Sequence, residues 1–209
     1  MIHHHQPILM RGAPLDQARL AVILLHGRGA SAEDILTLAD ALPRFGVAFF
    51  APQAANGSWY PNRFIAPVET NEPHLTSALE VVGDLTAKIV ARGIPHERIM
   101  LLGFSQGACL ALEFAARNPC RYGGVFGLSG ALIENGDRPR DYAGDMAGAP
   151  VFLGCSEADL HIPLERVHRT TMAFHRLGAV VTERIYPGLG HTVNEDELAF
   201  IAMTMQGAV

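Results

Sequence analysis

Features that mark several other classes of protein are missing from this sequence. No apolar run reaches the roughly 18 residues that a membrane-spanning helix requires. The first residues, Met-Ile-His-His-His-Gln-Pro, lack a cationic segment followed by an apolar one, so we expect no signal peptide. The three cysteines, Cys109, Cys120 and Cys155, are odd in number and have no metal-ligand spacing. They are expected to be buried free thiols in a reducing compartment, which predicts a cytoplasmic protein.

The sequence also has little net charge and no block of like charges. Lys and Arg number 16 and Asp and Glu 21, a net charge of −5 at pH 7, with no basic stripe. Nucleic acid is therefore not an expected partner. His3, His4 and His5 are consecutive but have no other cluster of ligands near them in the sequence. A native polar terminus or a tag remnant is a better interpretation than a metal clamp, and no metal is expected.

Apolar runs alternate with helical patterns along the chain. Hydrophobic residues make up 49% and charged residues 18% of the 209, which suits one domain, residues 1–209, with a sheet buried under helices. Most of the apolar runs are continuous rather than alternating, as in parallel strands buried on both faces. They cover residues 20–25, 47–50, 99–102, 124–128, 150–155 and 180–186, and residues 8–11 are a candidate extra strand.

The helical patterns between these runs have recognisable starts. Ser31 is expected to cap a helix over 32–42, Asn71 to open one over 71–91, and Asn194, with Glu197 in capping-box spacing, to start one over 195–205. Two more patterns cover 108–117 and 163–177. This alternation predicts an α/β fold with a mostly parallel, doubly wound sheet and helices on both faces.

The most informative motif is Gly103-Phe104-Ser105-Gln106-Gly107. It lies between an apolar strand candidate and a helical pattern, the context in which a serine becomes a nucleophile on a sharp strand-to-helix turn. Side chains at 103 and 107 would crowd the neighbouring strand and helix. The alternative is a glycine-rich turn with an incidental serine, and the flanking elements favour a nucleophilic Ser105.

A serine nucleophile needs a base and an acid, which follow it in this kind of fold in the order acid, then histidine. Four histidines follow Ser105. His191 is expected to be the base because it follows the last strand through a glycine-containing loop. His168 and His175 belong to a helical pattern and are expected to be solvated, and His161 is expected at the pocket edge or surface.

The acid is expected at the end of the preceding strand. Asp159 lies just before a helix that begins with proline, in reach of a histidine loop from the next strand. Glu157 is the alternative, and we interpret it as a solvated loop residue.

Two backbone N–H groups are expected to stabilise the oxyanion. One belongs to Gln106, after the nucleophile, and the other to Arg28 in the loop Leu25-His26-Gly27-Arg28-Gly29. This loop does not have the spacing of a phosphate-binding loop. His26 is expected to brace it. The Arg28 side chain either attracts acidic substrates or points to solvent.

Two long loops are expected at the carboxyl ends of strands, where ligands bind in open α/β sheets. The loop over 51–70 supplies candidate pocket residues Trp59, Tyr60 and Phe64, with Trp59 the best single candidate, and Leu160 is a further one. The aromatic loop could instead simply cover the core or serve a homodimer contact. The loop over 131–149 is too short and polar for a large lid, so an open site without a cap domain is expected.

Four motifs together resemble one known family. Leu-His-Gly-Arg-Gly, Gly-Phe-Ser-Gln-Gly, Asp-Leu-His-Ile-Pro and Gly-Leu-Gly-His occur in the order found in the carboxylesterase/phospholipase family of α/β-hydrolases. That family includes acyl-protein thioesterases and small bacterial carboxylesterases. The resemblance covers residue 20 to the C-terminus and implies an α/β-hydrolase fold, the triad Ser105, Asp159 and His191, the backbone donors Arg28 and Gln106, and no cofactor.

The sequence departs from the thioesterase branch in two places. Ala30 stands where that branch usually has an acidic residue, and the stretch over 56–61 is more similar to bacterial esterases. We therefore expect a serine carboxylesterase for small, short-chain or aryl esters, with a small-molecule ester as its partner. Alternatives are an acyl thioesterase or lysophospholipase with the same residues, a peptidase, and a non-catalytic ligand binder of this fold.

Overall fold

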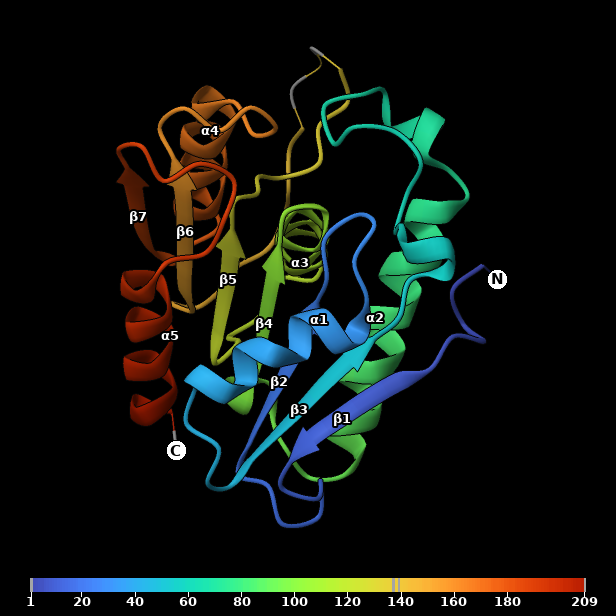
Figure 1. Cartoon of the computed structure of the whole chain (residues 1–209), viewed down its shortest axis with the longest axis vertical. Coiled ribbons are helices and arrows are strands. Elements are labelled where there is room, and N and C mark those ends of the chain that lie inside the picture. Colours follow the sequence, from blue (N-terminus) through green and yellow to red (C-terminus); the bar gives the residue numbers. More distant parts are fainter. Residues whose placement is uncertain (1, 137, 139, 209) are drawn as a thin grey trace.

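One sheet runs through the molecule. The computed structural model describes residues 2–136, 138 and 140–208. Within them the sheet has seven strands in the order β1-β3-β2-β4-β5-β6-β7 (Figure 1). The strands are β1 (Ile8–Gly12), β2 (Leu20–Leu25), β3 (Val47–Pro52), β4 (Ile99–Phe104), β5 (Gly124–Leu128), β6 (Pro150–Ser156) and β7 (Val180–Tyr186). The expected N-terminal strand is present as β1, which pairs antiparallel with β3, and the other pairings are parallel.

Helices cover both faces of the sheet. They are α1 (Ala32–Leu36), α2 (His74–Ala91), α3 (Gln106–Arg117), α4 (Leu164–Arg176) and α5 (Glu195–Gly207). Short 3-10 helices cover Thr37–Ala41, Ala55–Gly57, Val68–Asn71 and His96–Arg98. Figure 1 shows α1 and α5 on the near side of the sheet, with α3 on the other side. The fold predicted from the alternation is therefore present.

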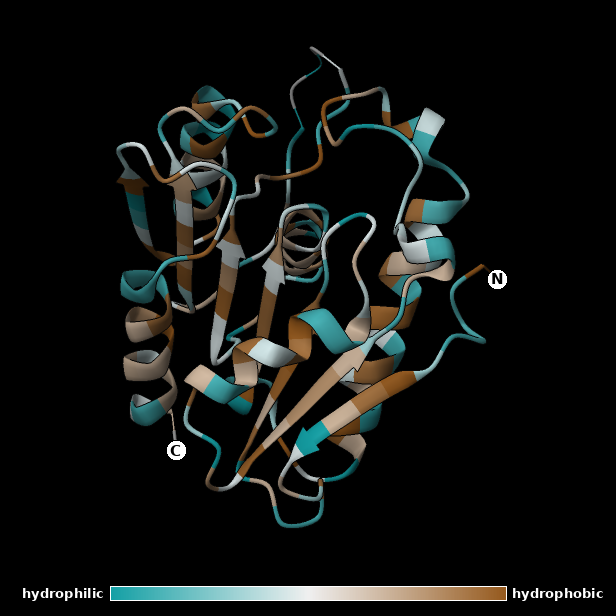
Figure 2. Ribbon diagram, viewed as in Figure 1, coloured by the Kyte–Doolittle hydropathy of each residue, from teal (hydrophilic) through white to brown (hydrophobic). Residues whose placement is uncertain are grey.

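Each central strand contributes to two hydrophobic cores because successive side chains point to opposite faces. In β2, Ala21, Ile23 and Leu25 belong to the core under α2, α3 and α4, while Leu20, Val22 and Leu24 belong to the core under α1 and α5. Figure 2 shows hydrophobic colour along β2, β3 and β4 and mixed colour along α2. The continuous apolar runs of the sequence therefore correspond to strands buried on both faces.

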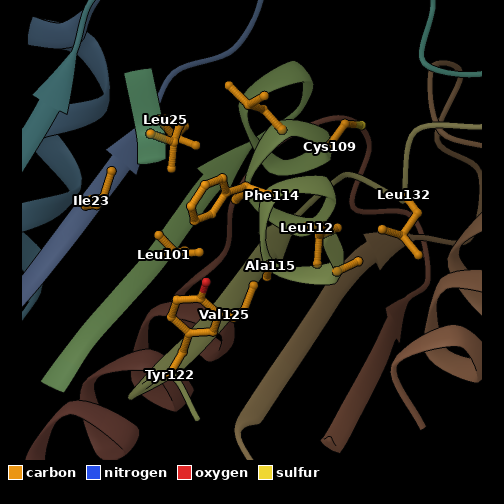
Figure 3. Close-up of a cluster of buried hydrophobic side chains, with 14 of the residues drawn as sticks. Ile23, Leu25, Leu101, Cys109, Leu112, Phe114, Ala115, Tyr122, Val125 and Leu132 are labelled. Carbon is orange, nitrogen blue, oxygen red and sulfur yellow. The ribbon is translucent and has the colours of Figure 1, made fainter. Parts of the chain in front are cut away.

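Helix α3 lies deep in the first core. Its residues from Gln106 to Ala116 are buried. Figure 3 shows Phe114 of α3 near Leu25 of β2 and Leu101 of β4, with Cys109 and Leu112 on the side of the helix toward Leu132. The helix that follows Ser105 is thus held firmly against the sheet, which fixes the position of the turn before it.

Two of the three expected helix starts are confirmed. Ser31 and Asp34 form a capping box at α1, and Asn194 and Glu197 form one at α5. The expected start at Asn71 is wrong, since α2 begins at His74. Asn71 is buried, and its side chain accepts a hydrogen bond from the Asn62 N–H at 2.8 Å and donates to the Arg63 carbonyl at 3.3 Å. It holds the preceding loop rather than capping a helix.

Candidate active site

Ser105 lies on a strained turn between β4 and α3. Its backbone has φ 54° and ψ −118°, a conformation that non-glycine residues rarely adopt. Gly103 and Gly107 allow the turn, since a Cβ at 103 would overlap the backbone of Gly107 and one at 107 would overlap the carbonyl of Leu25. Because the buried helix and strand fix both ends, the turn presents Ser105 at the carboxyl edge of the sheet.

The side chains of Ser105, His191 and Asp159 form a chain of hydrogen bonds. His191 Nε2 is 2.8 Å from Ser105 Oγ, and His191 Nδ1 is 2.7 Å from Asp159 Oδ2. Since a carboxylate only accepts hydrogen bonds, Nδ1 carries the proton and Nε2 can accept the proton of the hydroxyl. This is the arrangement in which a serine oxygen becomes a nucleophile.

Asp159 is held as a carboxylate. Its side chain is fully buried, which alone would raise its pKa. Hydrogen bonds from His191 and from the backbone N–H groups of His161 and Ile162, the latter two to Oδ1 at 2.8 and 3.0 Å, outweigh burial and leave the pKa of Asp159 below its ordinary value. Glu157, the alternative acid, is exposed.

His191 is positioned by the loop between β7 and α5. Gly188 and Gly190 have φ 67° and 76°, conformations that favour glycine, and the Gly190 N–H donates to Ser156 Oγ at 3.1 Å. The imidazole packs between two rings, with centroid distances of 5.0 Å to Phe104 and 4.7 Å to His161. His161, expected at the pocket edge or surface, is exposed and lines the cavity described below.

The loop after β2 packs directly against the nucleophile turn. A Cβ on Gly27 would lie 3.5 Å from the Cβ of Ser105. Gln106 begins α3, so its N–H has no partner within the helix. Arg28 and Gln106 both line the cavity that Ser105 faces, so their N–H groups come from the two segments expected to form an oxyanion hole.

Among the described residues, the side chain of Arg28 binds backbone carbonyls and no carboxylate, so it does not point freely to solvent. Its guanidinium donates hydrogen bonds to the backbone carbonyls of Tyr60, Pro61 and Asn62 at 2.9, 2.7 and 2.7 Å. The guanidinium therefore stabilises one turn of the neighbouring loop. This bracing role was not among the sequence-based expectations.

Trp59 does not line the substrate cavity, which corrects the expectation for this residue. Its side chain is 0% exposed, and its indole Nε1 donates to the carbonyl of His26 at 2.9 Å. His26 in turn is buried, donates from Nδ1 to the Gly27 carbonyl at 2.8 Å and accepts from the Ala54 N–H at 3.1 Å. Burial lowers the pKa of His26, so it stays neutral and braces the loop as expected.

His3 belongs to the same buried framework. It is 1% exposed, with Nε2 3.0 Å from the Trp59 carbonyl and Nδ1 accepting from the Ala55 N–H at 3.0 Å. Burial lowers the pKa of His3, which favours the neutral ring that can both donate and accept. His3 is thus part of the folded structure, which the interpretation of the N-terminal histidines as a polar terminus or tag remnant did not anticipate.

A cavity of about 590 Å³ opens at Ser105. Tyr60 and Phe64 line it, together with Phe104, Cys109 and Ile162, which the sequence did not single out. Burial raises the pKa of Cys109 to about 12, so this thiol stays protonated and does not compete with Ser105.

Leu160 is not among the residues that line the cavity. Its side chain is 92% exposed, while the next two residues, His161 and Ile162, face the cavity instead. The expectation for Leu160 is therefore wrong by one or two positions, because no periodic pattern fixes side-chain direction in an irregular loop.

Two other features are absent from the described residues. No group of three or more His, Cys, Asp and Glu side chains is placed to hold a metal ion in that part of the chain. None of the described helices combines the length and apolar character needed to cross a membrane.

The chain is similar in sequence and structure to known proteins of one family. The family model described as Phospholipase/Carboxylesterase matches residues 12–207. Acyl-protein thioesterase 1 of Eremothecium gossypii is 32% identical, and the match covers 88% of this chain and 87% of that protein. A crystal structure of a phospholipase/carboxylesterase from Dyadobacter fermentans has a TM-score of 0.93 and 42% identity over 99% of both chains.

A more distant structure shows how widely the fold is shared. The carboxylesterase of Bacillus cereus has a TM-score of 0.78 at 19% identity, covering 99% of this chain and 96% of that one. The α/β-hydrolase fold without a large cap in the described residues is thus confirmed. Because the family model spans nearly the whole sequence, this chain belongs to the phospholipase/carboxylesterase family and is a serine hydrolase.

Proposed function

We propose that the chain is a carboxylesterase that hydrolyses small, short-chain or aryl, carboxylic esters through an acyl-enzyme. The observation that carries this proposal is the continuous hydrogen-bond chain from Asp159 through His191 to Ser105. It supplies a nucleophile, a base and a group that fixes the base in one tautomer.

The proposed reaction begins with attack of Ser105 Oγ on the ester carbonyl carbon while His191 Nε2 takes the hydroxyl proton. The negative charge on the carbonyl oxygen is stabilised by the backbone N–H groups of Arg28 and Gln106, each worth roughly 10²–10³ in rate. His191 then gives its proton to the leaving alcohol oxygen as that bond breaks. A water molecule hydrolyses the acyl-enzyme by the same proton path in reverse.

The preference for small esters is supported by the composition of the cavity wall. The volume of the cavity, about 590 Å³, lies within the range of roughly 300–1,000 Å³ that is typical of small-molecule sites. Polar side chains of Asn62, Arg63 and His161 interrupt the apolar wall formed by residues such as Phe64 and Ile162. A long acyl chain favours a continuous apolar surface, which this mixed wall does not offer.

Hydrolysis of acyl thioesters is a second candidate, supported by the relatives named acyl-protein thioesterase. A series of p-nitrophenyl esters from acetate to palmitate, with wild type beside Ser105→Ala, tests both candidates. We expect turnover that is highest for short chains and absent in the variant. A maximum at long chains would favour the thioesterase or lysophospholipase activity, and no turnover in folded protein would contradict the esterase proposal.

A further inference from the structure

The mouth of the active-site cavity carries positive charge that the hydrolysis of a neutral ester does not require. Arg28 and Arg63 both line the cavity and are both exposed. No Asp or Glu is found among the described residues that line it. This local charge is opposite in sign to the chain as a whole, whose net charge is −5. It therefore acts on a bound molecule rather than attracting one from a distance.

The two guanidinium groups are engaged to different extents. The three carbonyls that Arg28 binds are consecutive and hold it in one orientation. Arg63 makes one side-chain hydrogen bond within the described part of the chain, from Nη2 to the His161 carbonyl at 3.3 Å. Because neutral carbonyls do not cancel a positive charge, both groups stay cationic, and Arg63 has donors left for a ligand.

Arg63 is connected through His161 to the part of the cavity next to His191. It contacts the backbone of His161, whose ring centroid is 4.7 Å from that of His191. In the proposed reaction His191 gives its proton to the alcohol oxygen, so the alcohol is adjacent to His191 as it departs. An anionic group on the alcohol part would consequently be within the field of Arg63.

We propose that the site prefers esters whose alcohol part carries a carboxylate, and that Arg63 is the residue that determines this preference. The inference rests on the proposed function, because it assigns a substrate class to the same site. A guanidinium is suited to this role, since its planar donors match the two oxygens of a carboxylate.

The test compares 4-acetoxybenzoate with its neutral methyl ester, which differ in charge on the alcohol part. For each enzyme variant, kcat/KM for each ester is divided by the rate constant of that ester's alkaline hydrolysis. The corrected value for the anionic ester is then divided by the corrected value for the neutral ester. Arg63→Gln is expected to lower this ratio about tenfold. Arg63→Lys is expected to retain only part of it, because lysine keeps the charge but not the planar pair of donors. In the wild type, 0.5 M NaCl should lower the ratio as well.

Arg121→Gln is the matched control, because it removes the same charge from an exposed residue before β5, at the opposite end of that strand from the site. It should leave the ratio unchanged. The same comparison with mono-p-nitrophenyl glutarate and its methyl ester places the charge on the acyl part, where Arg63→Gln should have little effect.

The outcomes separate this inference from the proposed function. Ser105-dependent hydrolysis of both acetoxybenzoates with a ratio that Arg63→Gln does not change overturns the carboxylate preference and leaves the esterase intact. An effect confined to the glutarate pair overturns the assignment to the alcohol side. Failure to hydrolyse both acetoxybenzoates and p-nitrophenyl acetate contradicts the esterase proposal, and the preference with it.

Discussion

The side-chain amide of Gln106 donates a hydrogen bond to the carbonyl oxygen of Tyr60, with the two atoms 2.7 Å apart. The oxygen of the same amide accepts the N–H of Trp59 at 2.9 Å. Gln106 directly follows Ser105, so the residue proposed to donate its backbone N–H to the oxyanion is also tied to the wall of the cavity. The position of this N–H and the shape of the wall depend on the same side chain.

Gln106→Ala is expected to impair both binding and catalysis. The backbone N–H remains, but the buried Trp59 N–H loses its partner. The Tyr60 carbonyl, which also accepts from Arg28 and Ser58, loses one of its donors. We expect kcat/KM for p-nitrophenyl acetate to fall at least tenfold and the free energy of unfolding to fall by about 1–3 kcal/mol. Steady-state kinetics and urea denaturation measure the two effects. Gln17→Ala, at an exposed position, is the control. Kinetics of Gln106→Ala equal to those of this control would contradict the proposed role of the Gln106 side chain.

Substitutions in the proposed triad should differ in severity. Ser105→Ala and His191→Ala are expected to lower kcat on the order of 10⁶-fold, and Asp159→Asn about 10⁴-fold, because the latter leaves the nucleophile and base in place. Single-turnover kinetics with an activated aryl ester would measure the residual rates.

Matched controls for these substitutions exist elsewhere in the chain. His168 is half-exposed on α4 and paired with Glu183, and Glu157 is the exposed rival of Asp159. His168→Ala and Glu157→Gln should keep kcat within about twofold of the wild type. Near-wild-type activity of Asp159→Asn combined with a large loss in Glu157→Gln would transfer the acid role to Glu157.

His3→Ala should destabilise the protein. The substitution removes the partners of the Trp59 carbonyl and the Ala55 N–H, for a loss of about 1–3 kcal/mol in the free energy of unfolding. His5→Ala, at an exposed position in the same segment, should have little effect. Urea denaturation at pH 8 distinguishes the two, and equal midpoints for both variants would refute the structural role of His3.

The contribution of His3 should depend on pH in a defined direction. Burial lowers its pKa below the ordinary 6.5, so the unfolded chain binds the proton more readily than the folded one. The stabilisation is thus present above pH 6.5 and is lost as the pH falls below it. The difference in the free energy of unfolding between wild type and His3→Ala should therefore be smaller when the urea denaturation is repeated at pH 5.5.

Glu197 should produce the opposite dependence. Its side chain is buried with Oε1 unpartnered among the described residues, and burial raises its pKa to about 7 from an ordinary 4.5. The folded state therefore holds a proton that the unfolded state releases, and stability should fall as the pH rises from 4.5 to 7, by on the order of 3 kcal/mol.

Glu197→Gln tests this dependence while keeping an acceptor for the Asn194 N–H, which Glu197 Oε2 accepts at 2.8 Å. The free energy of unfolding of the variant, measured at several pH values between 4.5 and 8, should lack the decline seen in wild type. Identical slopes for both proteins would show that Glu197 is ionised in the folded state throughout this range.

The three residues of the proposed triad were predictable because their signals are local. Gly103 and Gly107 surround Ser105 in a pattern with a steric cause. Chain order leaves four histidines and two acids, and the loop positions just after two strands then favour Asp159 and His191. The sheet was predictable for a similar reason, since each strand is a continuous apolar run. Local signals of this kind do not depend on which distant segment packs nearby.

The residues that were misjudged depend on distant partners. An aromatic residue in a loop has the same local pattern whether it lines a cavity or fills the space behind it. Trp59 is buried because His3, His26 and Gln106, which are far from it in sequence, bond to it. Asn71 could cap a helix by its residue type, but a loop eight or nine residues earlier uses its side chain instead.

The three hydrogen bonds from Arg28 to the carbonyls of residues 60–62 limit how the substrate range of this enzyme can be changed. One guanidinium links the cavity wall to the loop that carries the proposed oxyanion donor Arg28. Remodelling the wall at residues 60–62 would therefore also disturb the proposed catalytic site. Variation that alters selectivity while preserving rate should instead accumulate at Phe64 and Ile162, which line the cavity outside the segment that Arg28 holds. Directed libraries at those two positions are the better route to a new substrate range.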